Sequence, residues 1–357
     1  MRIGILTFHR AHNYGAVLQC YALQRYLASL GYDVRVIDYN RKELWAYYTW
    51  RLSWAERYAL QPSLKLPIRL LGYLWSRTRP LVRYCKFVWF QQHVLRLSPV
   101  SSIKSHPYDL ILIGSDQVWN TVITQGFDPY YWGAFERPQQ TKVATYAASL
   151  KETWNECDYE RVHEYFKCLD GISVRELAVK DMLLQLFPDI KAVHVPDPVL
   201  LLTATEWKHL AKKPRINTPY VFFYQAHRLE RVCTVAQRIA EQKRLPLVTL
   251  SADVNAENTA CCHSASPQEF LGWILHADLV VTSSFHALAF SIIFEKKFYA
   301  INLNLGQDER LKDLVRKVGL EDRLIDDESQ AHELKDFQSE ELLKRMRLRA
   351  EAYINSL

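Results

Sequence analysis

The sequence has no long apolar run, no C-x-x-C pair, no internal repeat and no low-complexity stretch. A helix that spans a membrane needs about 20 consecutive apolar residues, and no run here approaches that length. Residues 1–7 are too short and too strand-like for a signal peptide, so we expect a cytoplasmic protein. The seven cysteines are an odd number, and the adjacent Cys261 and Cys262 are sterically unsuited to an ordinary disulfide. Reduced thiols are therefore expected.

Two further absences concern ligands. No group of Asp and His has the spacing of metal ligands, and the run Cys261, Cys262, His263 lacks the paired spacing of a zinc site, so no metal is expected. No recognised RNA- or DNA-binding motif accompanies the positive charge. We therefore expect no nucleic-acid partner.

The chain has enough hydrophobic residues to form the cores of two folded domains. The chain has 357 residues, of which 49% are hydrophobic and 24% charged, and this length predicts two domains. Strand-like and helix-like segments alternate, which predicts α/β domains with parallel sheets. The expected strands are residues 3–8, 34–37, 110–113, 142–146, 192–195, 220–224, 246–250, 279–281 and 298–301. The expected helices are residues 15–30, 230–243 and 285–294, a further helix opened by a capping box at 266–269, and one at the C-terminus.

These elements divide into two Rossmann-like domains that we expect to enclose a ligand-binding cleft. Residues 1–207 form the first domain and residues 208–330 the second, with 208–219 as the linker. Residues 331–357 carry a helix that is expected to pack on the body of the protein, with apolar residues at Leu342, Met346, Ala350 and Tyr353.

Residues 41–97, here called the basic insertion, interrupt the first domain with a helical pattern. They contain 11 Lys or Arg against two Glu, and five of the ten tryptophans. Cations among aromatic rings suit an anionic membrane surface. The alternative is ordinary packing, with arginine side chains extending around buried aromatic rings.

Polar motifs follow several of the expected strands. After the first strand, FHRAHNYGAVLQ brings Asn13 and Gly15 to the start of a helix, where a phosphate or a sugar hydroxyl could bind. The alternative makes Asn13 a helix cap. After residues 110–113 comes GSDQVWN, in which a carboxylate, amides and an indole resemble a carbohydrate site, with candidate residues Ser115, Asp116, Trp119 and Asn120. A turn with Trp119 in the core is the alternative.

Two more motifs offer cations and hydroxyls. Arg175 ends a short strand and could bind a carboxylate or phosphate, or instead pair with Glu176. In TSSFHALAFS, Ser284 and His286 lie where a strand runs into a helix, and Lys296 follows at the far end of that helix. Together these residues suggest an anion-binding site with a titratable group.

The motifs NYGAVLQ, LILIGSDQVWN, ISVRE, VPDPVLLL, PQEFLGWILHADLVVTSSFHALAFSIIFEKKF and RLKDLVRKVGLEDRL occur in this order along residues 1 to about 325. In order and spacing the chain resembles the polysaccharide pyruvyl transferase family. GSDQVWN and the SFH segment are the specific motifs. The chain departs from the family at Ala287, where a glycine is usual, and at Ser266, where a Gly-Pro pair usually precedes Glu-Phe.

The resemblance implies a fold similar to B-type glycosyltransferases and transfer of pyruvate from phosphoenolpyruvate to a sugar as a ketal. His286 is then the expected acid and Asp116 the expected base, and no cofactor is needed. The acceptor would belong to a capsule or exopolysaccharide and be carried on a polyprenyl phosphate, which would place the enzyme at the inner face of the plasma membrane. Two alternatives remain: a nucleotide-sugar glycosyltransferase of the same architecture, and a non-catalytic glycan-binding protein.

Overall fold

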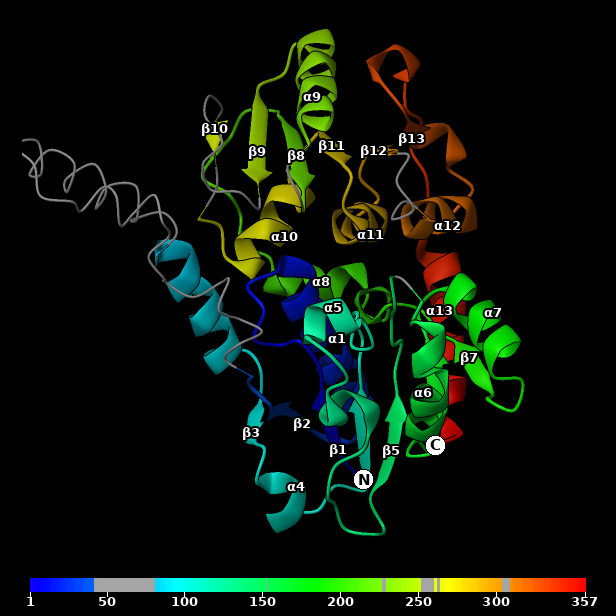
Figure 1. The fold of residues 1–357 in the computed structure, drawn as a ribbon. Coiled ribbons are helices and arrows are strands. Elements are labelled where there is room, and N and C mark those ends of the chain that lie inside the picture. Colours follow the sequence, from blue (N-terminus) through cyan, green and yellow to red (C-terminus); the bar gives the residue numbers. More distant parts are fainter. Residues whose placement is uncertain (42–80, 152, 227–228, 252–259, 262–263, 304–308) are drawn as a thin grey trace, which may run out of the picture. The chain divides into compact units, whose positions relative to one another are not determined.

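The computed structural model describes residues 1–41, 81–151, 153–226, 229–251, 260–261, 264–303 and 309–357 (Figure 1). The chain forms two compact units, each built around a parallel sheet. Unit 1 contains Met1–Leu44, Gln91–Glu206 and Gln338–Leu357, and unit 2 contains Trp45–Phe90 and Trp207–Phe337. The expected α/β class with two Rossmann-like domains is confirmed. Within the described ranges, no helix is both long and apolar enough to cross a membrane.

The sheet of unit 1 has the strand order β3-β2-β1-β4-β5, and every neighbouring pair is parallel. Its strands are β1 (Arg2–Leu6), β2 (Asp33–Asp38), β3 (Leu97–Pro99), β4 (Leu110–Ile113) and β5 (Lys142–Thr145). All four residues of β4 are buried, as expected for a central strand covered on both faces. A further pair, β6 (Ile172–Val174) and β7 (Ala192–His194), continues from β5 through parallel bridges at Gly171 and Val174.

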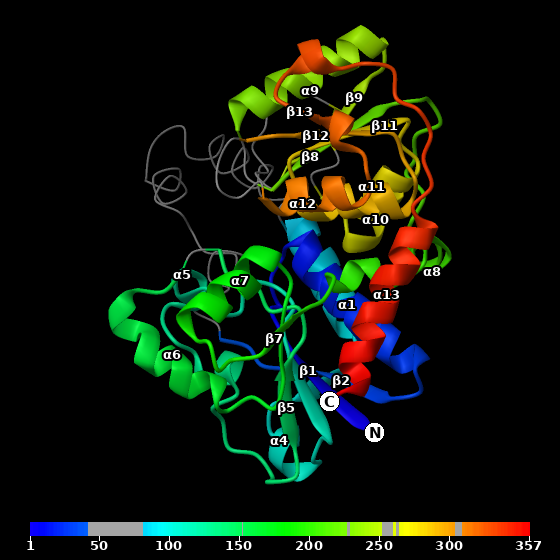
Figure 2. The same cartoon turned by 90° about the vertical axis from the view of Figure 1, so that its right-hand side faces the viewer.

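The helices of unit 1 are α1 (Tyr14–Ser29), α4 (Ser102–Ser105), α5 (Thr121–Thr124), α6 (Tyr159–Phe166), α7 (Leu177–Leu186) and α13 (Glu340–Asn355), while α8 (Ala204–Leu210) lies at the junction with unit 2. Helix α13 packs on unit 1 beside α1 (Figure 2). Its Tyr353 hydroxyl donates a hydrogen bond of 2.8 Å to the carbonyl of Thr145. Leu343 is buried, whereas the expected Leu342 is only partly buried.

Unit 2 contains the strand order β10-β9-β8-β11-β12-β13, again all parallel. Its strands are β8 (Val221–Gln225), β9 (Leu247–Ser251), β10 (Ala260–Cys261), β11 (Leu279–Thr282), β12 (Phe298–Ile301) and β13 (Leu324–Ile325). Its helices are α9 (Glu230–Lys243), α10 (Pro267–Leu275), α11 (Phe285–Ile293) and α12 (Glu309–Lys317). The predicted capping box of α10 is present, because Ser266 and Glu269 bind each other's backbone N–H.

The described end of the basic insertion is helical over residues 81–93. Lys86 forms a 2.6 Å ion pair with Glu269 of α10, and the Lys212 ammonium lies 5.4 Å from the Trp89 ring centre. Residues 81–90 accordingly group with unit 2. Residues 42–80 of the insertion lie outside the described residues.

Candidate functional site

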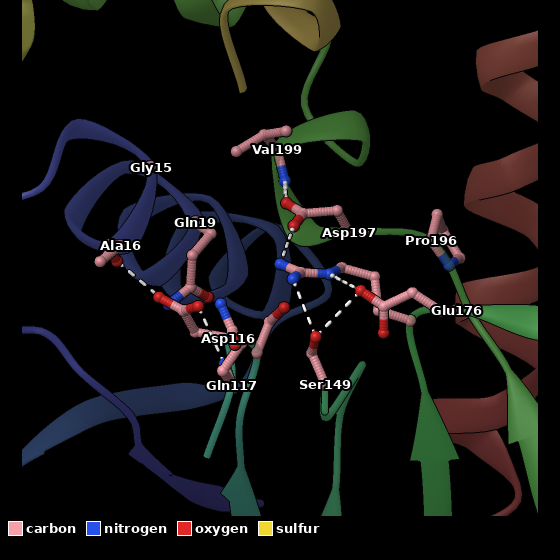
Figure 3. A network of polar contacts seen from close by, with 12 residues as sticks. Gly15, Ala16, Gln19, Asp116, Gln117, Ser149, Glu176, Pro196, Asp197 and Val199 are labelled. Atoms are coloured by element: carbon pink, nitrogen blue, oxygen red, sulfur yellow. Dashed lines mark hydrogen bonds and ion pairs between the residues drawn. The ribbon is translucent and has the colours of Figure 1, made fainter. Parts of the chain in front are cut away.

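Polar residues line the carboxyl ends of the strands of unit 1. Parallel strands end at the same edge of a sheet, so residues that are distant in sequence meet there. We call this set the polar row; its members are Thr7, Asp38, Ser115, Asp116, Ser149, Arg175, Glu176 and Asp197. Figure 3 shows its central part beside the first turn of α1.

Buried hydrogen bonds connect β1, β4 and α1 at this edge. The Thr7 hydroxyl donates to the carbonyl of Ser115 at 2.8 Å and accepts from the Gln19 amide at 3.0 Å. All three residues are buried. The Ser115 Oγ and the Gln19 Oε1 have no hydrogen-bond partner among the described residues.

An ion-pair cluster lies at the ends of β1 and β2. The His9 Nε2 is 3.0 Å from the Asp38 Oδ1, and the Arg10 Nε donates to the same oxygen at 2.8 Å. Burial alone would raise the pKa of the Asp38 carboxyl, but the hydrogen bonds from His9 and Arg10 hold that pKa well below its usual range. His9 is fully buried, so we assign this cluster a structural role at this edge of the sheet.

Asn13 caps helix α1, which was the alternative that the sequence left open. Its Oδ1 accepts hydrogen bonds from the N–H groups of Gly15 at 2.9 Å and Ala16 at 3.4 Å. Gly15 lies inside the first turn of the helix. Contact of these two residues with a sugar or phosphate stays a prediction.

The turn after β4 places Asp116 at the middle of the polar row. Gly114 has φ +109°, and a Cβ there would lie 2.6 Å from the carbonyl oxygen of Tyr146. Asp116 itself has φ +91°, a conformation that L residues rarely adopt. Its backbone carbonyl accepts from the Ser149 N–H at 3.0 Å. The residue is partly exposed, and its Oδ1 accepts from the N–H of Gln117 at 2.8 Å. Contact of Asp116 with a ligand stays a prediction.

Trp119 takes the core position that the sequence offered as its alternative, and Asn120 is a helix cap. The Trp119 indole is fully buried and stacks on Trp132 with ring centres 5.5 Å apart, so it presents no face to a sugar. Asn120 caps the short helix α5 by accepting from the N–H of Val122 at 3.1 Å.

Arg175 pairs with neighbouring side chains instead of presenting an open guanidinium. Its Nε donates to Glu176 at 2.9 Å, its Nη1 to Asp197 at 2.9 Å, and its Nη2 to the Ser149 hydroxyl at 3.0 Å (Figure 3). Burial alone would lower the pKa of this guanidinium. The negative charges of Glu176, Asp197 and Asp116 instead hold the pKa above its usual range. The local pairing with Glu176 is therefore present, and Glu176, Asp197 and Ser149 together accept from the guanidinium that was expected to bind a donor anion.

A second polar segment lies at the carboxyl end of β11 in unit 2. The Thr282 hydroxyl donates to the carbonyl of Tyr224 at 2.6 Å and accepts from the Ser284 N–H at 3.0 Å, which fixes the entry into α11. Ser284 occupies the N-cap position, yet its side chain makes no capping hydrogen bond. His286 is partly exposed in the first turn, with its ring centre 5.2 Å from that of Phe285.

Lys296 does not join His286. It follows the C-terminal end of α11, and the next residue, Lys297, accepts through its carbonyl from the N–H of Val280 near the start of β11. Burial lowers the pKa of Lys296, and Asp278 opposes the shift. Lys296 thus lies at the amino end of the sheet, whereas Ser284 and His286 lie at its carboxyl end.

Sequence reasoning missed Ser149, Glu176 and Asp197 as members of the polar row. Each follows a strand at the same edge, so strand ends alone could have indicated them. Within the described ranges, no group of three or more His, Cys, Asp or Glu could hold a metal ion.

The fold is that of a two-unit α/β protein. In each unit, polar and charged side chains lie at the carboxyl ends of the parallel strands. The polysaccharide pyruvyl transferase family model matches residues 13–304. The chain therefore belongs to the polysaccharide pyruvyl transferase family and is an enzyme of that kind. A search of curated proteins gives no match.

Solved structures similar to this chain include two UDP-N-acetylglucosamine 2-epimerases. The one from Methanocaldococcus jannaschii has 12% identity and a TM-score of 0.49, with 97% of this chain and 91% of that chain covered. The one from Neisseria meningitidis has 9% identity and a TM-score of 0.48, with 100% and 99% covered. At these values the likeness says nothing about what this chain binds or transforms.

Proposed function

We propose that this enzyme transfers pyruvate from phosphoenolpyruvate to a sugar of a polysaccharide or lipid-linked oligosaccharide and forms a ketal with two of its hydroxyls. The observation that carries the proposal is the position of the two specific family motifs. GSDQVWN follows β4 and SFH follows β11, so both lie at carboxyl ends of parallel strands, where α/β sheets bind ligands.

The donor is proposed to bind at unit 2. Phosphoenolpyruvate carries a phosphate and a carboxylate, and the first-turn N–H groups of a helix such as α11 favour an anion. Ser284 adds a hydroxyl that does not cap this helix, and His286 adds a titratable imidazole. The side chains of Arg175 and Lys296 are left out of this assignment, because the first is paired with carboxylates and the second lies at the other end of the sheet.

The proposed chemistry has two steps. In the first, His286 donates a proton to the methylene carbon of phosphoenolpyruvate, and a sugar hydroxyl adds to C2 as its own proton passes to Asp116. In the second, another sugar hydroxyl attacks C2 and its proton passes to the phosphate, which leaves with the C–O bonding electrons. Proton transfers of this kind typically contribute about 10²- to 10⁴-fold each to the rate. No cofactor takes part, and phosphoenolpyruvate is a co-substrate.

The acceptor is proposed to bind at unit 1, where Asp116 is partly exposed in the polar row. Its carrier is proposed to be a polyprenyl phosphate in a membrane. The basic insertion would then hold the enzyme on an anionic membrane surface, because it combines 11 cationic residues with five tryptophans.

A mass measurement tests this function. The purified protein is incubated with phosphoenolpyruvate or with UDP-sugars, together with lipid-linked oligosaccharide. A gain of about 70 Da on the acceptor indicates a pyruvate ketal, whereas about 162 Da indicates a hexose and would replace the proposal with glycosyl transfer. Acceptor binding without any gain would indicate a glycan-binding protein.

A further inference from the structure

Gln117 follows Asp116 in the turn after β4, and both residues are partly exposed. The Gln117 side chain accepts a hydrogen bond through its Oε1 from the Asn120 Nδ2 at 2.9 Å, which leaves Nε2 on the other side of the amide group. The Gln117 N–H donates to the Asp116 Oδ1 at 2.8 Å, which leaves Oδ2 on the other side of that carboxylate. Neither the Nε2 nor the Oδ2 is among the buried polar atoms that lack a partner in the described part of the chain.

A main-chain group fixes which atom of each amide is the donor. The N–H of Val122 can only donate, and it lies 3.1 Å from one side-chain atom of Asn120, which must therefore be the oxygen. The other atom of the Asn120 amide is then the Nδ2 donor, and the Gln117 atom that faces it must be an oxygen. The Gln117 Nε2, which carries two N–H donors, consequently faces away from Asn120.

The turn holds these groups in place before any ligand binds. The Asn120 N–H donates to the Gln117 carbonyl at 3.0 Å, and the Ser149 N–H donates to the Asp116 carbonyl at 3.0 Å. Asp116 keeps a φ of +91° within these bonds, and residues with such strained backbones concentrate at ligand sites. A side chain that is already held loses little conformational entropy when it binds a ligand.

The turn therefore presents an oriented donor beside an oriented acceptor. A metal ion or an ammonium group would suit the carboxylate but not the amide N–H groups, and an anion would suit the amide but not the carboxylate. A hydroxyl both donates and accepts, so two neighbouring hydroxyls of one sugar can satisfy the two groups together. The pair of side chains fits a neutral, hydroxyl-bearing part of a ligand.

We propose that Gln117 binds the acceptor sugar: its Nε2 donates to one hydroxyl oxygen, beside the hydroxyl whose proton passes to Asp116. Asn120 is then a positioning residue, because it turns the Gln117 donors toward the sugar. This inference rests on the proposed function and adds a binding residue and a positioning residue to it. Asp116 and Gln117 lie next to each other beside the first turn of α1 (Figure 3).

Two substitutions of Gln117 test the contact. Gln117→Ala removes the donor, and Gln117→Glu replaces it with an oxygen that cannot donate. We expect the acceptor KM to rise about 2- to 10-fold in Gln117→Ala, the range for loss of one neutral hydrogen bond, and further in Gln117→Glu, where two carboxylates adjoin. The KM for phosphoenolpyruvate and the thermal unfolding midpoint should match the parent. An unchanged acceptor KM in both variants would overturn the inference and leave the proposed function intact.

Asn120→Asp tests the orientation of Gln117. Aspartate can still cap α5 by accepting from the Val122 N–H, but it has no Nδ2 to donate to Gln117. The Gln117 amide should then rotate to donate to the aspartate, so that its oxygen faces the sugar. We expect the acceptor KM to rise as in Gln117→Ala, with no further rise in the double variant. Additive rises would contradict the positioning role of Asn120.

Gln140→Ala is the matched control. This glutamine is exposed and precedes β5, so it lies at the amino end of the same sheet. We expect the acceptor KM of this variant to equal that of the parent. An equal rise in Gln140→Ala and Gln117→Ala would show that the effect is not local to the turn, and would contradict the inference.

Calorimetry with methyl hexopyranosides and their monodeoxy analogues tests binding without turnover. One monodeoxy sugar should bind the parent more weakly than its hydroxylated counterpart, and Gln117→Ala should not weaken the binding of that analogue any further. Additive losses for every analogue, or no binding of any sugar in the series, would overturn the inference. A parent enzyme that binds these sugars yet adds no pyruvate to any acceptor would instead contradict the proposed function.

Discussion

Asp38 joins the ends of β1 and β2 through its hydrogen bonds with His9 and Arg10. Its pKa is lowered in the folded protein, so its contribution to stability is present above the unfolded pKa of about 3.9 and is lost as the pH falls below that value. We expect Asp38→Asn to cost about 1–3 kcal/mol at pH 7, because a buried imidazole loses its charged partner.

Chemical denaturation at pH 7 and at pH 3 measures this effect. The difference in unfolding free energy between parent and Asp38→Asn should shrink at the lower pH, since the parent carboxylate then becomes protonated in the unfolded chain. A difference that is the same at both pH values would show that the charge of Asp38 does not contribute.

His286 lies in the first turn of α11 and is partly exposed, so its removal leaves the core of unit 2 intact. We expect His286→Ala to lower turnover by about 10²- to 10⁴-fold, the usual size of a general-acid contribution, with little change in thermal unfolding. Phosphate release would be compared with the parent enzyme. Near-normal turnover would remove His286 from the mechanism.

Single residues show what the sequence could predict and where it could not decide. Asp116 and His286 could be located at strand ends from the pattern alone. Trp119 and Arg175 could not be assigned, since an indole after a strand either packs or stacks on a ligand, and an arginine either pairs locally or binds an anion. The three-dimensional neighbours, Trp132 and Glu176, decide these cases.

At the scale of elements, the turn after β4 depends on the backbone freedom of Gly114. We expect Gly114→Ala to lower stability and turnover, because a Cβ would lie 2.6 Å from a backbone oxygen and displace the Asp116 loop. Gly126 is the control, since its φ of +108° is nearly the same but no atom lies within 4 Å of its Cβ position.

Backbone strain of about 1–3 kcal/mol applies to both glycines, and the clash applies to Gly114 alone. Thermal unfolding and steady-state kinetics of the two alanine variants would separate these effects. Equal losses of stability and turnover would show that strain, rather than the contact with Tyr146, is what matters at Gly114.

Elements with a clear apolar pattern were predictable, and short ones were not. The bounds of β4, β12 and α9 agree with the sequence prediction, because each has a full apolar run or a helical period. By contrast, β3 has three residues and includes a proline, and β10 and β13 have two each, so no periodicity can appear. These short strands form because each makes backbone hydrogen bonds to a neighbouring strand of its sheet.

At the scale of the whole molecule, the two units are discontinuous in sequence. The second segment of unit 2 begins at Trp207, and the C-terminal helix returns to unit 1. Sequence could not show this return, since an amphipathic helix does not specify the surface on which it packs. The Tyr353 contact with Thr145 specifies it.

The basic insertion leads to a prediction about the intact protein. We expect binding to vesicles that contain anionic lipid, and loss of that binding when Arg77, Arg79 and Arg83 are changed to Glu. Each basic residue near an anionic surface contributes about 1 kcal/mol before screening by salt. Flotation at low and high salt would measure it.

The control is the same charge change at three exposed basic residues of α13, Lys344, Arg345 and Arg349. Flotation of this control should match that of the parent. If the insertion variant also floats like the parent, the insertion serves internal packing instead.

The mass of the acceptor after incubation with phosphoenolpyruvate tests the central claim most directly. The purified enzyme, phosphoenolpyruvate and a lipid-linked oligosaccharide should give a product heavier by about 70 Da, with one phosphate released for each acceptor modified. An acceptor of unchanged mass together with no released phosphate, across a panel of acceptors, would contradict pyruvyl transfer from phosphoenolpyruvate.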